Sequence, residues 1–158
     1  MSAGASGAKQ ALPYRTLAFE DLALGQRASL MRTVMDDDLH LFAAVTGDTN
    51  PIHISESFAA QSRFGQRIAH GMFTVSLVSA VIGTRLPGPG AVYLSQTIRF
   101  LGPVRIGDVV TATVEVVELL AERRRARLFC ECVADGKAVL EGEALLAAPG
   151  RGAGEGGA

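Results

Sequence analysis

The chain has 158 residues, of which 48% are hydrophobic and 20% are charged, and its formal net charge at pH 7 is −1. This length suits one domain with a buried core, and the composition is that of a globular protein. The nearly neutral charge gives no electrostatic reason to expect nucleic acid or an anionic membrane as a partner.

Both ends of the chain are rich in small residues. Residues 1–12 contain mainly Gly, Ala and Ser, and residues 149–158 are rich in Gly. Neither segment can bury enough apolar surface to offset the entropy lost on ordering, so we expect two disordered tails around one domain at 13–148. The N-terminus lacks the apolar stretch of a secretory signal, and the apolar run 72–82 is too short to span a bilayer. These features predict a cytoplasmic protein.

In the first half of the expected domain, the sequence pattern predicts one strand and three helices. Residues 27–34 have the pattern of a strand. A helix is expected over 36–45, where three aspartates at the start suit an N-terminus and Gly47 marks the end. A short helix is expected over 55–62. The segment 71–85 is apolar on nearly every side, which predicts a helix that is buried all round.

The second half changes to a hydrophobic period of two, which predicts four strands. Asp135-Gly136 is a strong hairpin turn between the last two. One strand followed by helices and then by consecutive strands indicates an α+β fold, with an antiparallel sheet curled around the helix 71–85. The expected strands and the residues that share a face are 91–101 (Val92, Leu94, Gln96, Ile98, Phe100), 109–117 (Val110, Ala112, Val114, Val116), 125–133 (Ala126, Leu128, Cys130, Cys132) and 138–146 (Leu140, Gly142, Ala144, Leu146).

The two cysteines, Cys130 and Cys132, lie two residues apart on an expected strand. They face the same side and are poorly placed to bridge each other. We interpret them as small core residues rather than as metal ligands or redox groups. The histidines and the aspartates do not have metal-site spacing either, so no metal and no redox cofactor is expected.

Residues 47–53 place a carboxylate, Asp48, and an imidazole, His53, five positions apart across an Asn-Pro turn. If the turn borders a pocket, the two groups can hold one water molecule and serve as acid and base for adding or removing water. A structural interpretation is equally available, because Asp48 and Asn50 are turn formers that cap backbone amides.

Gly71 stands at the start of the apolar helix. Its backbone N–H lies at the positive end of that helix and could stabilise negative charge on a carbonyl oxygen. The absence of a side chain would let the carbonyl approach closely. Simple helix capping is the alternative.

Residues 42–59 resemble the hydratase 2 motif of the MaoC-like hydratases, and the chain is similar to the short, single-domain (R)-specific enoyl-CoA hydratases of that family. Segments 68–72, 93–100 and 103–108 also resemble family segments, so the similarity covers roughly 30–147. It implies a hot-dog fold, in which a curved antiparallel sheet wraps one long helix. It also implies a homodimer with an acyl-CoA tunnel near the subunit interface.

The resemblance implies a reversible syn hydration of a trans-2-enoyl-CoA to an (R)-3-hydroxyacyl-CoA. Asp48 and His53 match the catalytic dyad, the N–H of Gly71 matches the group that binds the thioester carbonyl, and Asn50 matches the residue that shapes the turn. Either member of the dyad could protonate C2.

Two further positions on the apolar helix match family positions that face the substrate. Ser79 matches a polar residue of the site, and Ile82 matches a pocket position that affects acyl length. Ordinary packing on a buried helix is the alternative for both, and for Ile82 it is the favoured one.

Three other functions are compatible with the fold that the resemblance implies. A dehydratase could act on an acyl-carrier-protein thioester with the same dyad, a hot-dog thioesterase would release free thiol, and an inactive partner subunit would need a second polypeptide. Four arginines could contact CoA phosphates, and the sequence assigns none of them: Arg63, Arg67, Arg99 and Arg105.

Overall fold

The computed structural model of the protein describes residues 14–152. The tail expected at 1–12 lies outside the described residues, as do residues 153–158 of the second tail. In residues 149–152, the main-chain oxygen of Pro149 accepts a hydrogen bond from the Phe19 N–H at 2.8 Å, and Arg151 pairs with Asp21 at 2.6 Å. Within the described part of the chain, no helix is long and apolar enough to cross a membrane.

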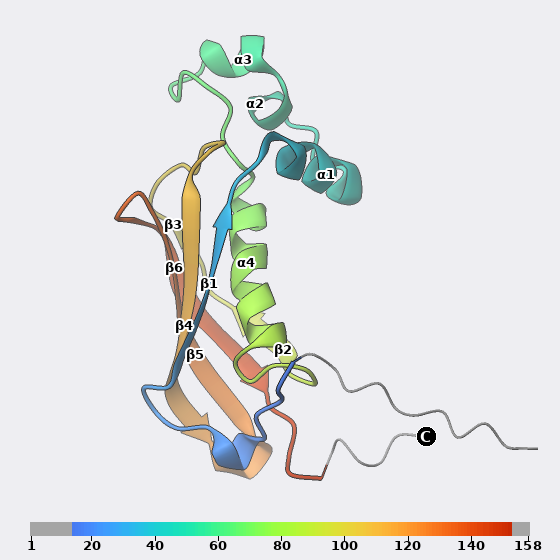
Figure 1. Ribbon diagram of the computed structural model, residues 1–158, viewed down its shortest axis with the longest axis vertical. Coiled ribbons are helices and arrows are strands. Elements are labelled where there is room, and N and C mark those ends of the chain that lie inside the picture. Colours follow the sequence, from blue (N-terminus) through green and yellow to red (C-terminus); the bar gives the residue numbers. More distant parts are fainter. Residues whose placement is uncertain (1–13, 153–158) are drawn as a thin grey trace, which may run out of the picture.

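Residues 14–152 form six strands and four α-helices, whose arrangement is shown in Figure 1. Two short 3-10 helices accompany them. In chain order the elements are η1 (Phe19–Asp21), β1 (Arg27–Thr33), α1 (Asp36–Thr46), α2 (Pro51–Ile54), α3 (Glu56–Ala60), α4 (Gly71–Thr84), β2 (Val92–Gln96), β3 (Arg99–Phe100), β4 (Val109–Leu120), η2 (Ala121–Arg123), β5 (Arg125–Ala134) and β6 (Lys137–Ala147).

All strands belong to one antiparallel sheet with the order β1-β4-β5-β6-β2, and β3 pairs with β6 beside this path. The sheet curves around α4, which lies along its inner face (Figure 1). The α+β class and the hot-dog arrangement are therefore confirmed.

The core lies between α4 and the inner face of the sheet. Alternate residues of β4 and β5 are buried, as their period of two predicts, and Cys130 and Cys132 are buried among them with free thiols. Burial raises the pKa of the Cys130 thiol to about 11 and that of Cys132 to about 12. Both thiols are therefore protonated and unreactive at neutral pH, which supports their interpretation as core residues.

The sequence predicts that the helix over 71–85 is buried all round. This prediction is wrong for the single chain, in which the helix is α4. One side of α4 is buried in the core, including Leu77, Val78 and Val81. The other side carries Ser76 and Ser79, which are exposed and border a cavity. Hydrophobicity alone did not separate a core-facing side from a cavity-facing side.

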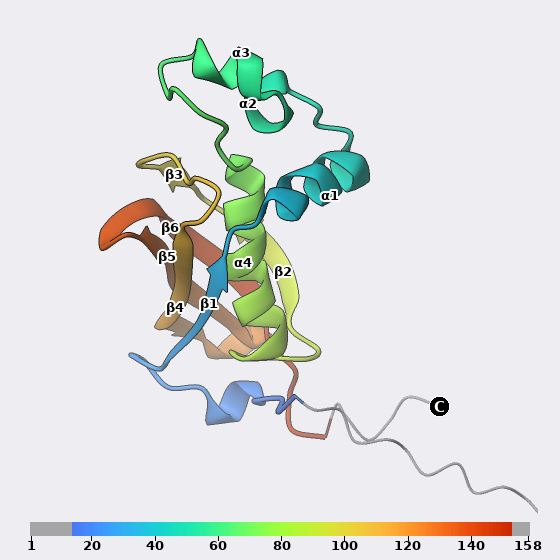
Figure 2. The same cartoon turned by 45° about the horizontal axis from the view of Figure 1, so that its top comes forward.

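Helices α1, α2 and α3 gather at one end of α4, beyond the edge of the sheet (Figure 2). Gly47 ends α1 in a left-handed conformation with φ 77°, as its position predicted. The helix expected over 55–62 is wrong in its bounds, because Ser55 ends α2 and caps α3, its hydroxyl accepting from the Phe58 N–H at 3.3 Å.

The single strand expected over 91–101 is also wrong. It is divided into β2 and β3, and a bulge near Leu94 shifts the register against β6. The break follows from a tertiary contact at Thr97, whose carbonyl oxygen would lie 1.8 Å from any Cβ at Gly142. Glycine at 142 lets the two backbones meet there, and the alternation expected along this strand is lost.

Candidate active site

Asp48 lies in the turn between α1 and α2, and the turn is held by its own side chains. The Asp48 N–H donates to Thr46 Oγ1 at 3.2 Å, and Asp48 Oδ1 accepts from the Asn50 N–H at 3.2 Å. Asn50 Oδ1 in turn accepts from the Ile52 N–H at 3.2 Å and caps α2. Asp48 and Asn50 thus have the capping contacts expected of turn formers, and the remaining carboxylate oxygen of Asp48 has no protein donor among the described residues.

His53 projects from α2 and is 8% exposed. Its Nδ1 lies 2.8 Å from the main-chain oxygen of Ile68. A carbonyl only accepts, so Nδ1 carries the proton of the neutral ring and the lone pair of Nε2 stays available. Burial lowers the pKa of His53 from its usual 6.5, which keeps the ring neutral at pH 7.

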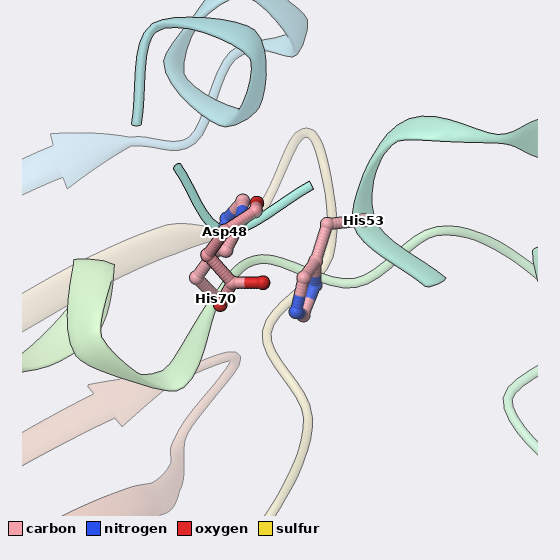
Figure 3. A group of neighbouring side chains, drawn as sticks. All are labelled: Asp48, His53 and His70. Carbon is pink, nitrogen blue, oxygen red and sulfur yellow. The ribbon is translucent and has the colours of Figure 1, made fainter. Parts of the chain in front are cut away.

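Asp48 and His53 come together in space, as the sequence predicted. A carboxylate oxygen of Asp48 and a ring nitrogen of His53 lie within 4.8 Å of each other, a separation that one water molecule can bridge. Figure 3 shows the Asp48 carboxylate turned toward the His53 ring. A water held there would meet an acceptor on each side.

A third side chain, His70, belongs to this group and was missed by the sequence analysis. Its ring stacks on that of His53 with centroids 3.9 Å apart, and its Nε2 lies 2.9 Å from the main-chain oxygen of Asp48 (Figure 3). The signals in the sequence were its position directly before Gly71 and its place in segment 68–72, which resembles a family segment. The contacts themselves join residues 22 and 17 positions apart along the chain.

Two imidazoles and a carboxylate are also a set of metal-ligand types, with one ligand atom from each within 4.8 Å of the others. The ring planes of His53 and His70 are only 29° apart and stacked. A nitrogen lone pair lies in the plane of its ring, so two stacked rings cannot both direct a lone pair at one ion. The geometry therefore does not suit a metal centre, and the absence of a cofactor stays a prediction.

Each member of the dyad lines a different cavity. His53 and Gly71 line a cavity of about 460 Å³, together with Arg63 and Phe100. Asp48 lines a more apolar cavity of about 580 Å³. The second cavity includes Ser79 but not Ile82, which is 2% exposed within the core. Its other lining residues are Phe42, Thr46, Met72, Val75, Ser76, Tyr93, Gln96 and Ile98.

Gly71 is the first residue of α4, where the N–H has no acceptor within the helix. A Cβ at this position would lie 2.7 Å from the Phe100 ring. A larger residue would therefore require the Phe100 ring to move, and Gly71 lines the cavity that His53 also lines. This placement is compatible with binding of a carbonyl oxygen.

The structure separates the four arginines that the sequence left unassigned. Arg67 pairs with Asp36 and with Glu56, and Arg99 pairs with Glu141. Arg105 has a buried Nε without a partner among the described residues.

Arg63 is exposed and lines the cavity of His53, with its guanidinium 4.8 Å from the centre of the Phe64 ring. Within residues 14–152 it makes no ion pair. It is therefore the one of the four that presents an uncompensated positive charge to that cavity.

A curved sheet around one helix, with a carboxylate and a neutral imidazole at the helix N-terminus, defines a hot-dog protein equipped for acid–base chemistry. The chain belongs to the family described as MaoC like domain, whose model matches residues 22–133. Several known proteins are similar to this chain, and their names describe hydratases or dehydratases.

A 3-hydroxybutyryl-CoA dehydratase of Methylorubrum extorquens is 58% identical over 135 residues, which are 85% of this chain and 86% of the relative. An (R)-specific enoyl-CoA hydratase of Rhodospirillum rubrum is 50% identical over 134 residues, 85% of this chain and 93% of the relative. The solved structure of an unliganded R-hydratase from Pseudomonas aeruginosa superposes with a TM-score of 0.82 at 43% identity, covering 85% of this chain and 87% of that one.

Proposed function

We propose that the protein catalyses the reversible syn hydration of trans-2-enoyl-CoA thioesters to (R)-3-hydroxyacyl-CoA thioesters. The observation that carries this proposal is the pairing of a neutral His53, with its Nε2 lone pair free, and the Asp48 carboxylate within 4.8 Å. The similarity to relatives named as a hydratase and a dehydratase of CoA thioesters supports the substrate class, and the name of the R. rubrum relative supports the (R) configuration.

In the hydration direction, Asp48 and His53 hold one water molecule between them. His53 Nε2 takes a proton from this water as its oxygen bonds to C3, and the electron pair of the C2–C3 double bond moves toward the thioester. The N–H of Gly71 stabilises the negative charge on the thioester oxygen. The protonated His53 then returns the proton to C2, so the elements of water are added and the enzyme is restored.

The Asp48 carboxylate orients the water by accepting its second hydrogen. This division of labour follows from the Nδ1 contact of His53 with Ile68, which leaves Nε2 as the basic atom. The reaction moves only the elements of water, so the proposal includes no metal and no redox cofactor. We place Ser79 beside the acyl chain in the Asp48 cavity and leave Ile82 in the core, where its effect on acyl length would be indirect.

A cytoplasmic homodimer is part of the proposal. Strand β2 lies at an edge of the sheet and exposes Val92 and Leu94, while its Tyr93 and Gln96 line the Asp48 cavity. An exposed apolar edge strand pairs readily with a second chain. A dimer formed there would place the acyl cavity beside the subunit interface.

The proposed function is tested by the loss of enoyl-thioester absorbance when the protein is added to crotonyl-CoA. We expect loss of absorbance with (R)-3-hydroxybutyryl-CoA as product and no free thiol. His53→Ala and Asp48→Asn should each lower kcat by several orders of magnitude while folding normally. Val78→Ala, a core change that touches neither cavity, is the control.

Other results would replace the proposal. Release of free thiol would indicate a thioesterase, and activity confined to acyl-carrier-protein thioesters would indicate the corresponding dehydratase. If the protein is inactive with short, long and branched enoyl-CoA and becomes active only when a second polypeptide is added, it is a partner subunit. Full activity in both single variants would refute the dyad.

A further inference from the structure

His70 is a polar residue, yet it is only 1% exposed. It lies directly before α4 and contacts two segments that are distant in sequence. Its Nε2 reaches the main-chain oxygen of Asp48 at 2.9 Å, and its ring stacks on His53 at 3.9 Å. One side chain thus contacts both members of the dyad and adjoins Gly71.

The contact with Asp48 shows which atom of His70 is the donor. A main-chain oxygen only accepts, so Nε2 carries a hydrogen and donates it to Asp48. Nδ1 is buried and has no hydrogen-bond partner among the described residues.

Ordinary packing does not account for this arrangement. The ring of Phe42 packs on His70 at 4.9 Å, and an apolar ring at position 70 could fill the same space without leaving a nitrogen unpaired. A polar group buried at such a cost is retained where its other polar atom has a specific task. Here that atom, Nε2, binds the backbone of Asp48.

We propose that His70 is a positioning residue that holds Asp48 and His53 in register with each other. Its Nε2–H fixes the main chain of Asp48, and its ring fixes the plane of the His53 imidazole against the start of α4. Because the carboxylate and Nε2 of His53 must share one water molecule, small displacements of either would lower turnover. The proposal deepens the proposed hydratase function and rests on it.

Three substitutions separate the two contacts. His70→Gln keeps an N–H donor near the position of Nε2 but removes the ring. His70→Phe keeps a stacking ring but removes the donor, and His70→Ala removes both. Val78→Ala, which opens a cavity on the core side of α4, controls for a general loss of packing.

The first readout is kinetic, with kcat and KM measured on crotonyl-CoA. We expect His70→Ala to lower kcat about a hundredfold while KM changes less than about threefold, as for a loss of alignment within the bound state. The kcat of His70→Gln and that of His70→Phe should each be about tenfold higher than the kcat of His70→Ala. Val78→Ala should stay within about twofold of the natural protein.

The second readout does not require activity. The chain has three histidines, so nitrogen NMR can resolve each ring. We expect Nε2 of His70 to carry a proton and His53 to be in the neutral Nδ1–H form at pH 7. Burial and the neighbouring imidazole both lower the pKa of His53. His70→Gln and His70→Ala remove that imidazole and should therefore raise the pKa of His53 toward 6.5. Val78→Ala should leave this pKa unchanged.

The outcomes are distinct. A His70→Ala protein that keeps the kcat of the natural protein and its His53 titration overturns the proposal, as does a His70 ring whose Nε2 carries no proton. If His70→Ala does not fold, the Gln and Phe variants carry the test, and equal kcat values in both and in the natural protein overturn it. Inactivity of the natural protein would refute the hydratase, while the NMR result would still decide the positioning.

Discussion

At the scale of single residues, two main-chain carbonyls determine which nitrogen of each imidazole carries the proton. The oxygen of Ile68 places the proton of His53 on Nδ1, and the oxygen of Asp48 places the proton of His70 on Nε2. One ring is therefore left with a basic nitrogen at the cavity, and the other with a donor at the turn. Two residues of one type thus receive different tasks from their backbone partners.

The first prediction at this scale concerns pH. His53 must be neutral to take a proton from water, and burial lowers its pKa below 6.5. The kcat/KM for hydration of crotonyl-CoA should therefore be constant from pH 7 to pH 8 and fall on acidification, with its midpoint below 6.5. An acid limb centred above 6.5 would contradict the assignment of His53 as a buried base. Protein stability should be checked over the same range, so that unfolding is not mistaken for titration.

The second prediction concerns Arg63 and the CoA end of the substrate. Its unpaired charge lines the His53 cavity, so it can meet a phosphate of the bound thioester. Arg63→Ala should raise the KM for crotonyl-CoA about threefold to fivefold, the effect of one exposed ion pair, and leave kcat unchanged. The KM for crotonyl-pantetheine, which has no phosphate, should not change.

Arg99→Ala is the matched control for Arg63, since Arg99 is exposed but paired with Glu141 and does not line the His53 cavity. It should leave both KM values unchanged. An equal rise in KM for both substrates in Arg63→Ala would show that the residue shapes the cavity and does not bind phosphate. The slope of KM against salt concentration gives an independent check, because a phosphate contact is screened.

At the scale of elements, the sequence predicted those parts whose cause is local. The alternation of β4 and β5, the Gly47 end of α1 and the Asp135-Gly136 hairpin depend on neighbouring residues, and all are confirmed. The division of the strand at Thr97 depends on Gly142, 45 positions away, so no local pattern could indicate it. The same reason explains why the dyad was found and His70 was not: Asp48 and His53 are five positions apart in the chain, whereas the contacts of His70 are tertiary.

One arginine contacts all three helices around the dyad. Arg67 is 10% exposed, pairs with Asp36 of α1 and Glu56 of α3, and donates to the main-chain oxygen of His53 at 3.4 Å. Such short helices are not stable by themselves, so these contacts hold the segment that positions His53.

Arg67→Met should therefore loosen α1–α3 with little effect on the sheet. We expect kcat on crotonyl-CoA to fall on the order of tenfold, because the water site between the two groups widens. Amide hydrogen exchange should accelerate in α2 and α3 and stay unchanged in β4 and β5. Arg99→Met also removes an ion pair, but from β3, and should change neither kcat nor the exchange rates of α2 and α3. Identical behaviour of the two variants would exclude a special role for Arg67.

At the scale of the whole molecule, the proposed acyl cavity connects the helical end of the fold with an edge of the sheet. Asp48, in the turn between α1 and α2, lines it, and so do Tyr93 and Gln96 of the edge strand β2. The bulge in β2 gives these two residues their common side despite a spacing of three. A second chain bound at this edge strand would therefore also border the proposed acyl cavity, and this would link assembly to catalysis.

The last prediction follows from this link. In the proposed homodimer, β2 of one chain lies at the subunit interface, where Val92 and Leu94 are 57% and 43% exposed in the single chain. Light scattering should give a mass twice that of the 16.5 kDa chain. The double substitution Val92→Lys with Leu94→Lys should reduce it to a single chain, because charges on an edge strand oppose pairing.

The same double variant should lose most of its activity although the dyad is intact, since its acyl cavity lacks the support of the second chain. Val117→Lys is the matched control: Val117 is 42% exposed but lies in β4, which is not an edge strand, so mass and kcat should stay unchanged. A double variant that remains a dimer would exclude β2 as the interface. A fully active single chain would show that assembly and the acyl cavity are independent.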